Sequence, residues 1–313
     1  VLEAKQLEQQ QRHARYQATN LEPNLKESAG GLRDLQTILW IAGAAGIAKS
    51  WSELARRELI TSAEAREIGR EERFLQTLRI RLHYLAGRRE DRLLFDHQTA
   101  LAAQFGLHDR PQRLASEQLM QRYYRAAKAV SQLNTILLQN LTALVVPQHD
   151  REFREINEHF GVRGELLEAR STDLYDQHPA ALLETFSLLQ QHHELKGIGA
   201  HTLRALWRGR RHIDAAFRAR PEHRELFMSI LRSPTRVTRE LRRMNRYGVL
   251  GRYLPAFGRI AGQMQHDLYH VYTVDEHILK VVRNLRRFAV PELAHEFPFC
   301  SRLMSDFGRH EVL

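Results

Sequence analysis

A long apolar stripe between residues 119 and 144 constrains the fold of this chain more than any other feature. Its members recur at every third or fourth position, as Leu119, Tyr123, Ala127, Val130, Leu133, Leu137, Leu141 and Leu144. That spacing places the side chains on one face of an α-helix. Such a helix is stable in water only when other elements cover the apolar face, so the sequence predicts a packed helical domain.

Helical signals continue on both sides of this stripe. Ser50 with Glu53 and Thr61 with Glu64 have the spacing of capping boxes, and a second stripe is formed by Phe74, Leu78, Leu82 and Leu85. Residues 148–180 are polar and less regular, and no run of alternating strands occurs. We therefore predict an all-α, multi-helix, bundle-like fold.

One small extended segment is expected near residues 20–36. Pro23 and the Gly30–Gly31 pair favour extended and turned backbone there. Leu32 to Leu35 is compatible with either a short strand or the entry to a helix.

Composition places the chain among cytoplasmic proteins of two or three domains. The 313 residues can bury a sizeable core. The longest apolar run, Ile38 to Ala48, is too short to span a bilayer, and the polar N-terminal stretch has no signal-peptide pattern. Cys300 is the only cysteine, which excludes an intrachain disulfide and a cysteine-rich metal cluster.

The net charge of +10 raises the question of an anionic partner. The arginines are spread along the chain, and the densest groups, 208–211 and 239–246, are short. No aromatic residues interleave with them to form a base-stacking platform. We interpret the charge as a solvated basic surface, and nucleic-acid binding is not expected.

Residues 20–36 hold the first candidate site. Paired glycines at Gly30 and Gly31 allow the backbone to approach a phosphate closely. Lys26 and Arg33 could balance phosphate charge, and Asp34 could face a metal or orient a helix start. We favour the second interpretation for Asp34, a turn whose aspartate caps the next helix.

Residues 262–277 hold the second candidate site. Thr273 and Glu276 have capping-box spacing, so a helix should begin at Val274 with His277 in its first or second turn. An apolar face for that helix is supplied by Ile278, Val281, Val282 and Leu285. From the local sequence alone, we interpret His277 as an ordinary solvated histidine.

Four segments, in this order, resemble the bacterial PII uridylyltransferase/uridylyl-removing enzyme family. They are residues 20–36 (NLEPNLKESAGGLRDLQ), 91–96 (DRLLFD), 242–253 (RRMNRYGVLGRY) and 262–277 (GQMQHDLYHVYTVDEH). The family joins a nucleotidyltransferase domain, a helical region, an HD phosphohydrolase domain and two ACT domains. The resemblance covers nearly the whole chain and implies a central piece of such an enzyme.

The resemblance also implies domain boundaries. Residues 1–40 would be the C-terminal edge of the nucleotidyltransferase domain, 41–147 a helical domain, and 148–260 a helical inter-domain region. Residues 261–313 would be the incomplete start of the HD domain. The parent enzyme adds UMP from UTP to the PII signal protein and removes it again, with glutamine as the signal and magnesium or manganese as the metal.

The same resemblance assigns roles to the candidate residues. Lys26, Gly30, Gly31, Arg33 and Asp34 would lie at the edge of the nucleotide site, while the D-x-D carboxylates of the transferase pattern are missing from the chain. The chain alone is therefore expected to be inactive and to bind no metal tightly.

His277 would be the first metal ligand of the HD site. The family's His-Asp pair follows that ligand, whereas His266 and Asp267 precede it, so this pair is expected to be structural. Tyr269, His270 and Tyr272 are expected to pack in the core.

Three other classes are compatible with parts of the sequence. A glutamine-synthetase adenylyltransferase relative would share the Gly-Gly-x-Arg type of block but not the YTVDEH segment. A non-catalytic α-helical scaffold and an arginine-rich nucleic-acid-binding protein are the remaining alternatives.

Overall fold

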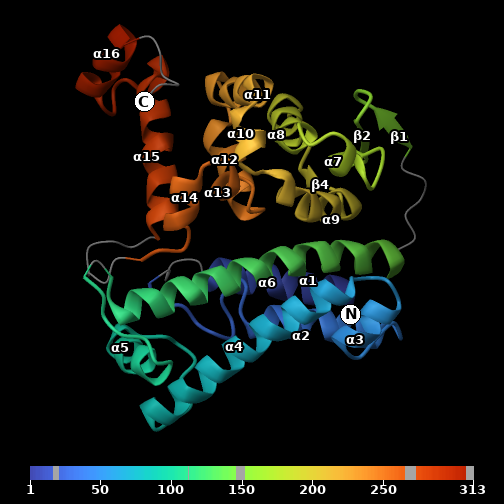
Figure 1. Cartoon of the computed structure of the whole chain (residues 1–313), viewed down its shortest axis with the longest axis vertical. Helices are drawn as coiled ribbons and strands as arrows, with labels where there is room; N and C mark the ends of the chain where they lie inside the picture. Colours follow the sequence, from blue (N-terminus) through green and yellow to red (C-terminus); the bar gives the residue numbers. More distant parts are fainter. Residues whose placement is uncertain (17–20, 112, 146–151, 265–272, 308–313) are drawn as a thin grey trace. The chain divides into compact units, whose positions relative to one another are not determined.

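The computed structural model describes residues 1–16, 21–111, 113–145, 152–264 and 273–307. The chain divides into two compact units (Figure 1). The first contains residues 1–149 and 260–274, and the second contains residues 150–259 and 275–313. The domain boundaries expected from the family resemblance stay predictions.

The first unit is built from helices, as the apolar stripes predict. The longest of them, α6, carries the 119–144 stripe and contacts α2, α4 and α5. Leu119 to Leu141 of that stripe are buried, but Leu144 is 59% exposed, so the covered face ends one turn before the helix does. The helices are α1 (Leu2–Tyr16), α2 (Leu32–Ala44), α3 (Trp51–Arg56), α4 (Ser62–Ala86), α5 (Phe95–Gln104) and α6 (Ala115–Val145).

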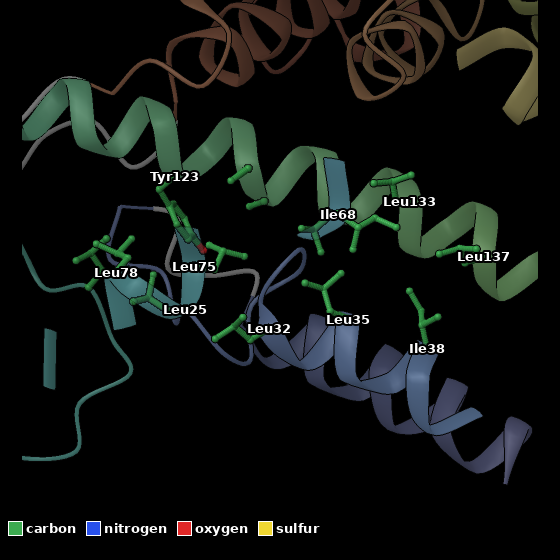
Figure 2. Close-up of a cluster of buried hydrophobic side chains, with 14 of the residues drawn as sticks. Leu25, Leu32, Leu35, Ile38, Ile68, Leu75, Leu78, Tyr123, Leu133 and Leu137 are labelled. Carbon is green, nitrogen blue, oxygen red and sulfur yellow. The ribbon is translucent and has the colours of Figure 1, made fainter. Parts of the chain in front are cut away.

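Aliphatic side chains from all six helices contribute to the core of this unit. Figure 2 shows Leu35 and Ile38 of α2 facing Leu133 and Leu137 of α6. Leu75 of α4 lies beside Tyr123 of α6 in the same cluster, and both side chains are essentially inaccessible to water. Burial of this apolar surface is the main force that holds the helices together.

Caps fix where two of these helices begin. At α4 the Glu64 amide donates to Thr61 Oγ1 (3.1 Å) and the Thr61 amide donates to Glu64 Oε2 (2.6 Å), which confirms the capping box. At α3 Ser50 Oγ accepts from the Glu53 amide, as predicted. The Glu53 carboxylate reaches one residue further back and accepts from the Lys49 amide at 2.5 Å.

The second unit is also mainly helical, and α8 lies at its centre. Phe186 and its apolar neighbours on α8 are fully buried, and the helix contacts α11 and α12. The helical elements are α7 (Leu174–Gln177), α8 (Ala181–Gln191), α9 (Ala200–Gly209), η1 (Arg210–His212), α10 (Ala215–Ala219), α11 (Pro221–Arg232), α12 (Val237–Arg246), α13 (Leu250–Tyr253), α14 (Pro255–Ile260), α15 (Val274–Phe288), η2 (Pro291–Leu293) and α16 (Pro298–Phe307).

A small mixed sheet in the second unit corrects the all-α prediction. Its strands are β1 (Phe153–Glu155), β2 (Phe160–Arg163), β3 (Leu166–Ala169) and β4 (Gly197–Ile198), in the order β1-β2-β3-β4. The first two pairings are antiparallel, and β4 joins β3 in parallel. Strands of two to four residues are too short to show a period of two, which is why the sequence pattern missed them.

A turn signal for this sheet was present in the sequence. Arg163 pairs with Leu166, so β2 and β3 are joined by a two-residue hairpin loop that begins with Gly164 at φ +66°. A glycine at the first position of such a loop is typical of the type II′ turn.

The extended segment expected near residues 20–36 is only an isolated bridge. Asn24 pairs with Arg92 in antiparallel fashion, and the residues after it form turns. Helix α2 begins at Leu32, so Leu32 to Leu35 is a helix entry and not a strand. In the described part of the chain no helix is both long enough and apolar enough to cross a membrane.

We predict that Leu35→Ala lowers the free energy of unfolding by about 2–5 kcal/mol, because a fully buried leucine would leave a cavity against α6. Urea denaturation followed by circular dichroism measures this. Leu7→Ala is the matched control, since Leu7 of α1 is 55% exposed, and its expected effect is below about 0.5 kcal/mol. Equal losses in the two variants would contradict the described core.

Candidate functional site

The connection between α1 and α2 is a compact loop with its own hydrogen bonds. Asn24 Oδ1 accepts from the amides of Lys26 (3.0 Å) and Glu27 (2.8 Å), as in an Asx turn. The Asn24 amide in turn donates to Ser28 Oγ at 3.0 Å. Leu25 is completely buried beneath these bonds. The loop backbone is thus determined by local polar contacts and one apolar anchor.

The 91–96 motif lies beside this loop. The Leu25 amide donates to the Asp91 carbonyl (2.8 Å), and the Leu93 amide donates to the Pro23 carbonyl (2.9 Å). Glu22 Oε1 accepts from the Phe95 amide at the start of α5 (3.0 Å). Two motifs that are far apart in the sequence therefore form one backbone-paired structure.

The Gly30–Gly31 pair allows the loop to pack closely against protein backbone. Gly30 has φ +78°, and a Cβ there would lie 2.0 Å from the carbonyl oxygen of Ala127 in α6. A Cβ on Gly31 would lie 2.7 Å from the Lys26 carbonyl oxygen. Both positions require glycine for steric reasons that arise within the chain itself.

Asp34 is fully buried, and protein groups surround its carboxylate. Arg12 Nη2 donates to Oδ1 (2.6 Å), His13 Nε2 lies 2.9 Å from the same oxygen, and the Gly30 amide donates to Oδ2 (2.7 Å). The N-cap of α2 is Gly31, and Asp34 reaches back from the first turn to the residue before that cap. Protein donors thus contact both oxygens of the Asp34 carboxylate.

The phenol of Tyr123 in α6 has a raised pKa. Loss of solvent is the main cause, and the nearby Asp34 carboxylate raises the pKa further. Tyr123 therefore stays neutral at all physiological pH values.

Three cations lie around Glu27, a residue that the sequence analysis did not single out. Arg33 Nη2 lies 3.2 Å and Lys26 Nζ 3.4 Å from Glu27 Oε1, and Arg12 Nε lies 3.7 Å from Oε2. Arg33 also stands over the ring of Trp40, with 5.2 Å between its guanidinium carbon and the ring centroid. Lys26 and Arg33 are partly exposed, so the loop presents a cationic rim to solvent.

The second candidate region begins at α15. This helix starts at Val274 as predicted, and His277 is exposed in its first turn. The neighbouring carboxylates are engaged with α12, because Asn245 Nδ2 donates to Asp275 Oδ2 (2.9 Å) and Arg242 Nη2 lies 2.6 Å from Glu276 Oε1. The 242–253 motif thus contacts the helix that carries His277.

The residues predicted to form the apolar face of α15 are exposed or only partly buried. Ile278 is 37% and Val281 44% exposed, and Leu279 is the buried apolar residue of this helix. His266, Asp267, Tyr269, His270 and Tyr272 lie outside the described residues. Among the described residues, no group of three or more His, Cys, Asp or Glu side chains could hold a metal ion.

Comparison with known proteins assigns the chain to a family. The profile described as GlnD PII-uridylyltransferase matches residues 1–138, and the profile described as uridylyltransferase GlnD third domain matches residues 160–253. The chain belongs to the PII-uridylyltransferase family. The first profile matches residues of the first compact unit, and the second profile matches residues of the second unit.

Relatives from named bacteria are similar over nearly the whole chain. A protein of Nitrosospira multiformis named bifunctional uridylyltransferase/uridylyl-removing enzyme is 60% identical over 99% of this chain and 35% of its own length. A protein of the same name from Chromobacterium violaceum is 58% identical over 99% of this chain and 37% of its own length. The chain therefore spans little more than a third of these relatives. None of the solved structures matches it.

Asp91 lies in the segment that pairs with the α1–α2 loop, and its carboxylate forms ionic contacts with Arg79 and His83. Burial raises the pKa of the Asp91 carboxyl, but hydrogen bonds from Arg79 (Nε, 2.5 Å) and His83 (3.1 Å) outweigh it, and the net pKa lies below the ordinary 3.8. The ionised form of Asp91 therefore stabilises the segment that pairs with the loop.

We predict that Gly30→Ala destabilises the first unit by several kcal/mol, because both the positive φ and the contact with Ala127 oppose a side chain. Gly46→Ala is the matched control. Gly46 has φ +67° but open space around it, so its expected cost is about 1 kcal/mol. Thermal unfolding followed by circular dichroism separates the two effects, and equal melting temperatures would contradict the close approach.

We predict that Asp91→Asn lowers the free energy of unfolding by about 1 kcal/mol at pH 7. The folded pKa of Asp91 is depressed, so its stabilisation is complete above the unfolded pKa and is lost as the pH falls through the folded value. The difference between the two proteins should shrink below pH 3.8. Urea titrations at several pH values measure it, and a difference that grows toward acid would contradict the assignment.

Proposed function

We propose that this chain is the central part of a bifunctional enzyme that transfers UMP from UTP to the PII signal protein and removes it again. The observation that supports the proposal is 60% identity across 99% of the chain to a protein with that name. Glutamine would be the signal that the whole enzyme senses, and the cytoplasm its location. The activity belongs to the whole enzyme, since the chain spans little more than a third of its relatives.

The cationic rim of the α1–α2 loop is proposed as the edge of the UTP site. Lys26 and Arg33 would face the phosphates, where positive charge stabilises the transferring group. Gly30, Gly31 and Asp34 would act by holding the loop against α6, α1 and α2. A magnesium or manganese ion would be held by residues other than these, because the Asp34 carboxylate is occupied by protein donors.

His277 is proposed as the first metal ligand of the uridylyl-removing site. It is exposed on α15, and the carboxylates beside it are tied to α12 through Asn245 and Arg242. Those contacts fix the start of α15 and so the direction in which His277 is presented. Among the described residues no group of three or more His, Cys, Asp or Glu side chains could hold a metal ion, so the chain by itself should bind divalent metal weakly.

The decisive experiment is His277→Ala in the full-length enzyme. Removal of UMP from PII should be abolished, while transfer of labelled UMP to PII should continue at the normal rate, because the two reactions use different ligands. His193→Ala is the control, since His193 is exposed but lies outside α15, and both activities should persist in it. Normal removal by the His277→Ala enzyme would contradict the assignment of His277.

A further inference from the structure

The small sheet of the second unit buries apolar side chains on one face, while its other face, which we call the polar face, carries Arg163 and Glu168. Phe160, Val162 and Leu167 point to the apolar face and are at most 3% exposed. Because side chains alternate along a strand, the residues between them belong to the other face. Phe153 pairs with Arg163, and Gly161 pairs with Glu168, so these four positions lie side by side on the polar face.

An open cavity of about 370 Å³ lies over this polar face. Its lining consists of Phe153, Arg163, Glu168, Ala169, Arg170 and His201. A cavity of this size can accept a ligand as large as a nucleoside phosphate. The lining combines an aromatic ring, basic side chains and a carboxylate, which is the chemistry that such a ligand requires.

Two glycines place the ring and the carboxylate in this cavity. A Cβ on Gly161 would lie 2.2 Å from the Phe153 ring, and a Cβ on Gly199 would lie 1.8 Å from Glu168 Oε1. The ring and the carboxylate therefore lie directly against backbone at positions where any side chain would displace them.

Hydrogen bonds orient the Glu168 carboxylate. Thr202, which is 1% exposed, donates from Oγ1 to Glu168 Oε2 (2.7 Å) and accepts from the Ala169 amide (2.8 Å). Thr202 and His201 belong to the first turn of α9, whose amides carry partial positive charge. The cavity thus presents a fixed carboxylate, and His201 lines the same cavity.

Basic side chains also line the cavity over the polar face of the sheet. The Arg163 guanidinium carbon lies 5.9 Å from the centroid of the Phe153 ring. Arg170 forms an ion pair with Glu155 at 2.6 Å, and Arg163 and His201 are the other basic residues that line the cavity. Arginine suits phosphate because its planar fork can donate two parallel hydrogen bonds.

We propose that this cavity binds a nucleoside phosphate. The base stacks on the ring of Phe153, the ribose hydroxyls donate to Glu168, and the phosphate is bound by Arg163 and His201 at the start of α9. Stacking on an aromatic ring tolerates any base, so the site selects for the nucleotide class and not for one base. This site is separate from the α1–α2 loop and does not depend on the function proposed above.

Isothermal titration calorimetry of the 313-residue chain with UMP, uridine and orthophosphate tests the proposal. UMP should bind, and uridine and orthophosphate should each bind at least about tenfold more weakly, because each lacks one half of the recognised ligand. Phe153→Leu and Arg163→Gln should each raise the Kd for UMP about tenfold or more. Arg163→Lys should restore only part of the affinity, since lysine keeps the charge but lacks the fork.

Arg154→Gln is the matched control. Arg154 neighbours Phe153 on β1, points to the opposite face of the sheet and pairs with Glu194 at 3.6 Å. Its loss should leave the Kd for UMP unchanged, and circular dichroism checks that each variant is folded.

Three results would overturn the proposal. They are an absence of UMP binding, equal binding of orthophosphate and UMP, and equal weakening by Arg154→Gln and Arg163→Gln. UMP binding that is lost in Lys26→Gln but kept in Arg163→Gln would also reject this cavity and assign the nucleotide to the α1–α2 loop.

Discussion

The first unit depends on one buried carboxylate. Asp34 has no exposure to solvent, yet its contacts reach α1 through Arg12 and His13 and the loop through the Gly30 amide. The carbonyl of the same residue accepts from Asn134 of α6 at 3.0 Å, so four parts of the fold meet there. A buried ionic group is tolerated only when its partners are complete, and loss of one partner typically costs about 3–5 kcal/mol. The position of the cationic rim formed by Lys26 and Arg33 follows from this arrangement.

The sequence predicted the helices well because their signals are local and repeated. The 119–144 stripe and the Thr61–Glu64 capping box reappear in the structure. The sheet was missed because its strands are too short for a periodic pattern, although the Gly164 hairpin turn marked it. The distant partners of Asp34, namely Arg12, His13 and Asn134, and the pairing of Glu22 with α5 could not be predicted, since they join residues between 21 and 100 positions apart that only the tertiary fold brings together.

The two candidate regions differ in what the described residues supply. The α1–α2 loop has a complete set of contacts that explains each predicted residue: glycines for close packing, Asp34 for the ionic contacts, and Lys26 and Arg33 around Glu27. At α15 the structure explains the neighbours of His277, because Asp275 and Glu276 are held by α12, but among the described residues it assembles no group of three or more possible metal ligands. Family membership, and not geometry, therefore gives His277 its proposed role.

The packing of α1 has a consequence for the order in which the chain acquires structure during synthesis. Gln9 donates to Asn134 (2.6 Å) and Gln6 donates to Thr142 (2.9 Å), and both partners lie on the last helix of the first unit. A ribosome makes the chain from its N-terminus, so α1 leaves the exit tunnel long before α6 exists. Until then this polar helix lacks the part of its covering that α6 supplies, and a single helix of its length is marginal in water. Helix α1 is thus made before α6 and is locked in place only after α6 has formed.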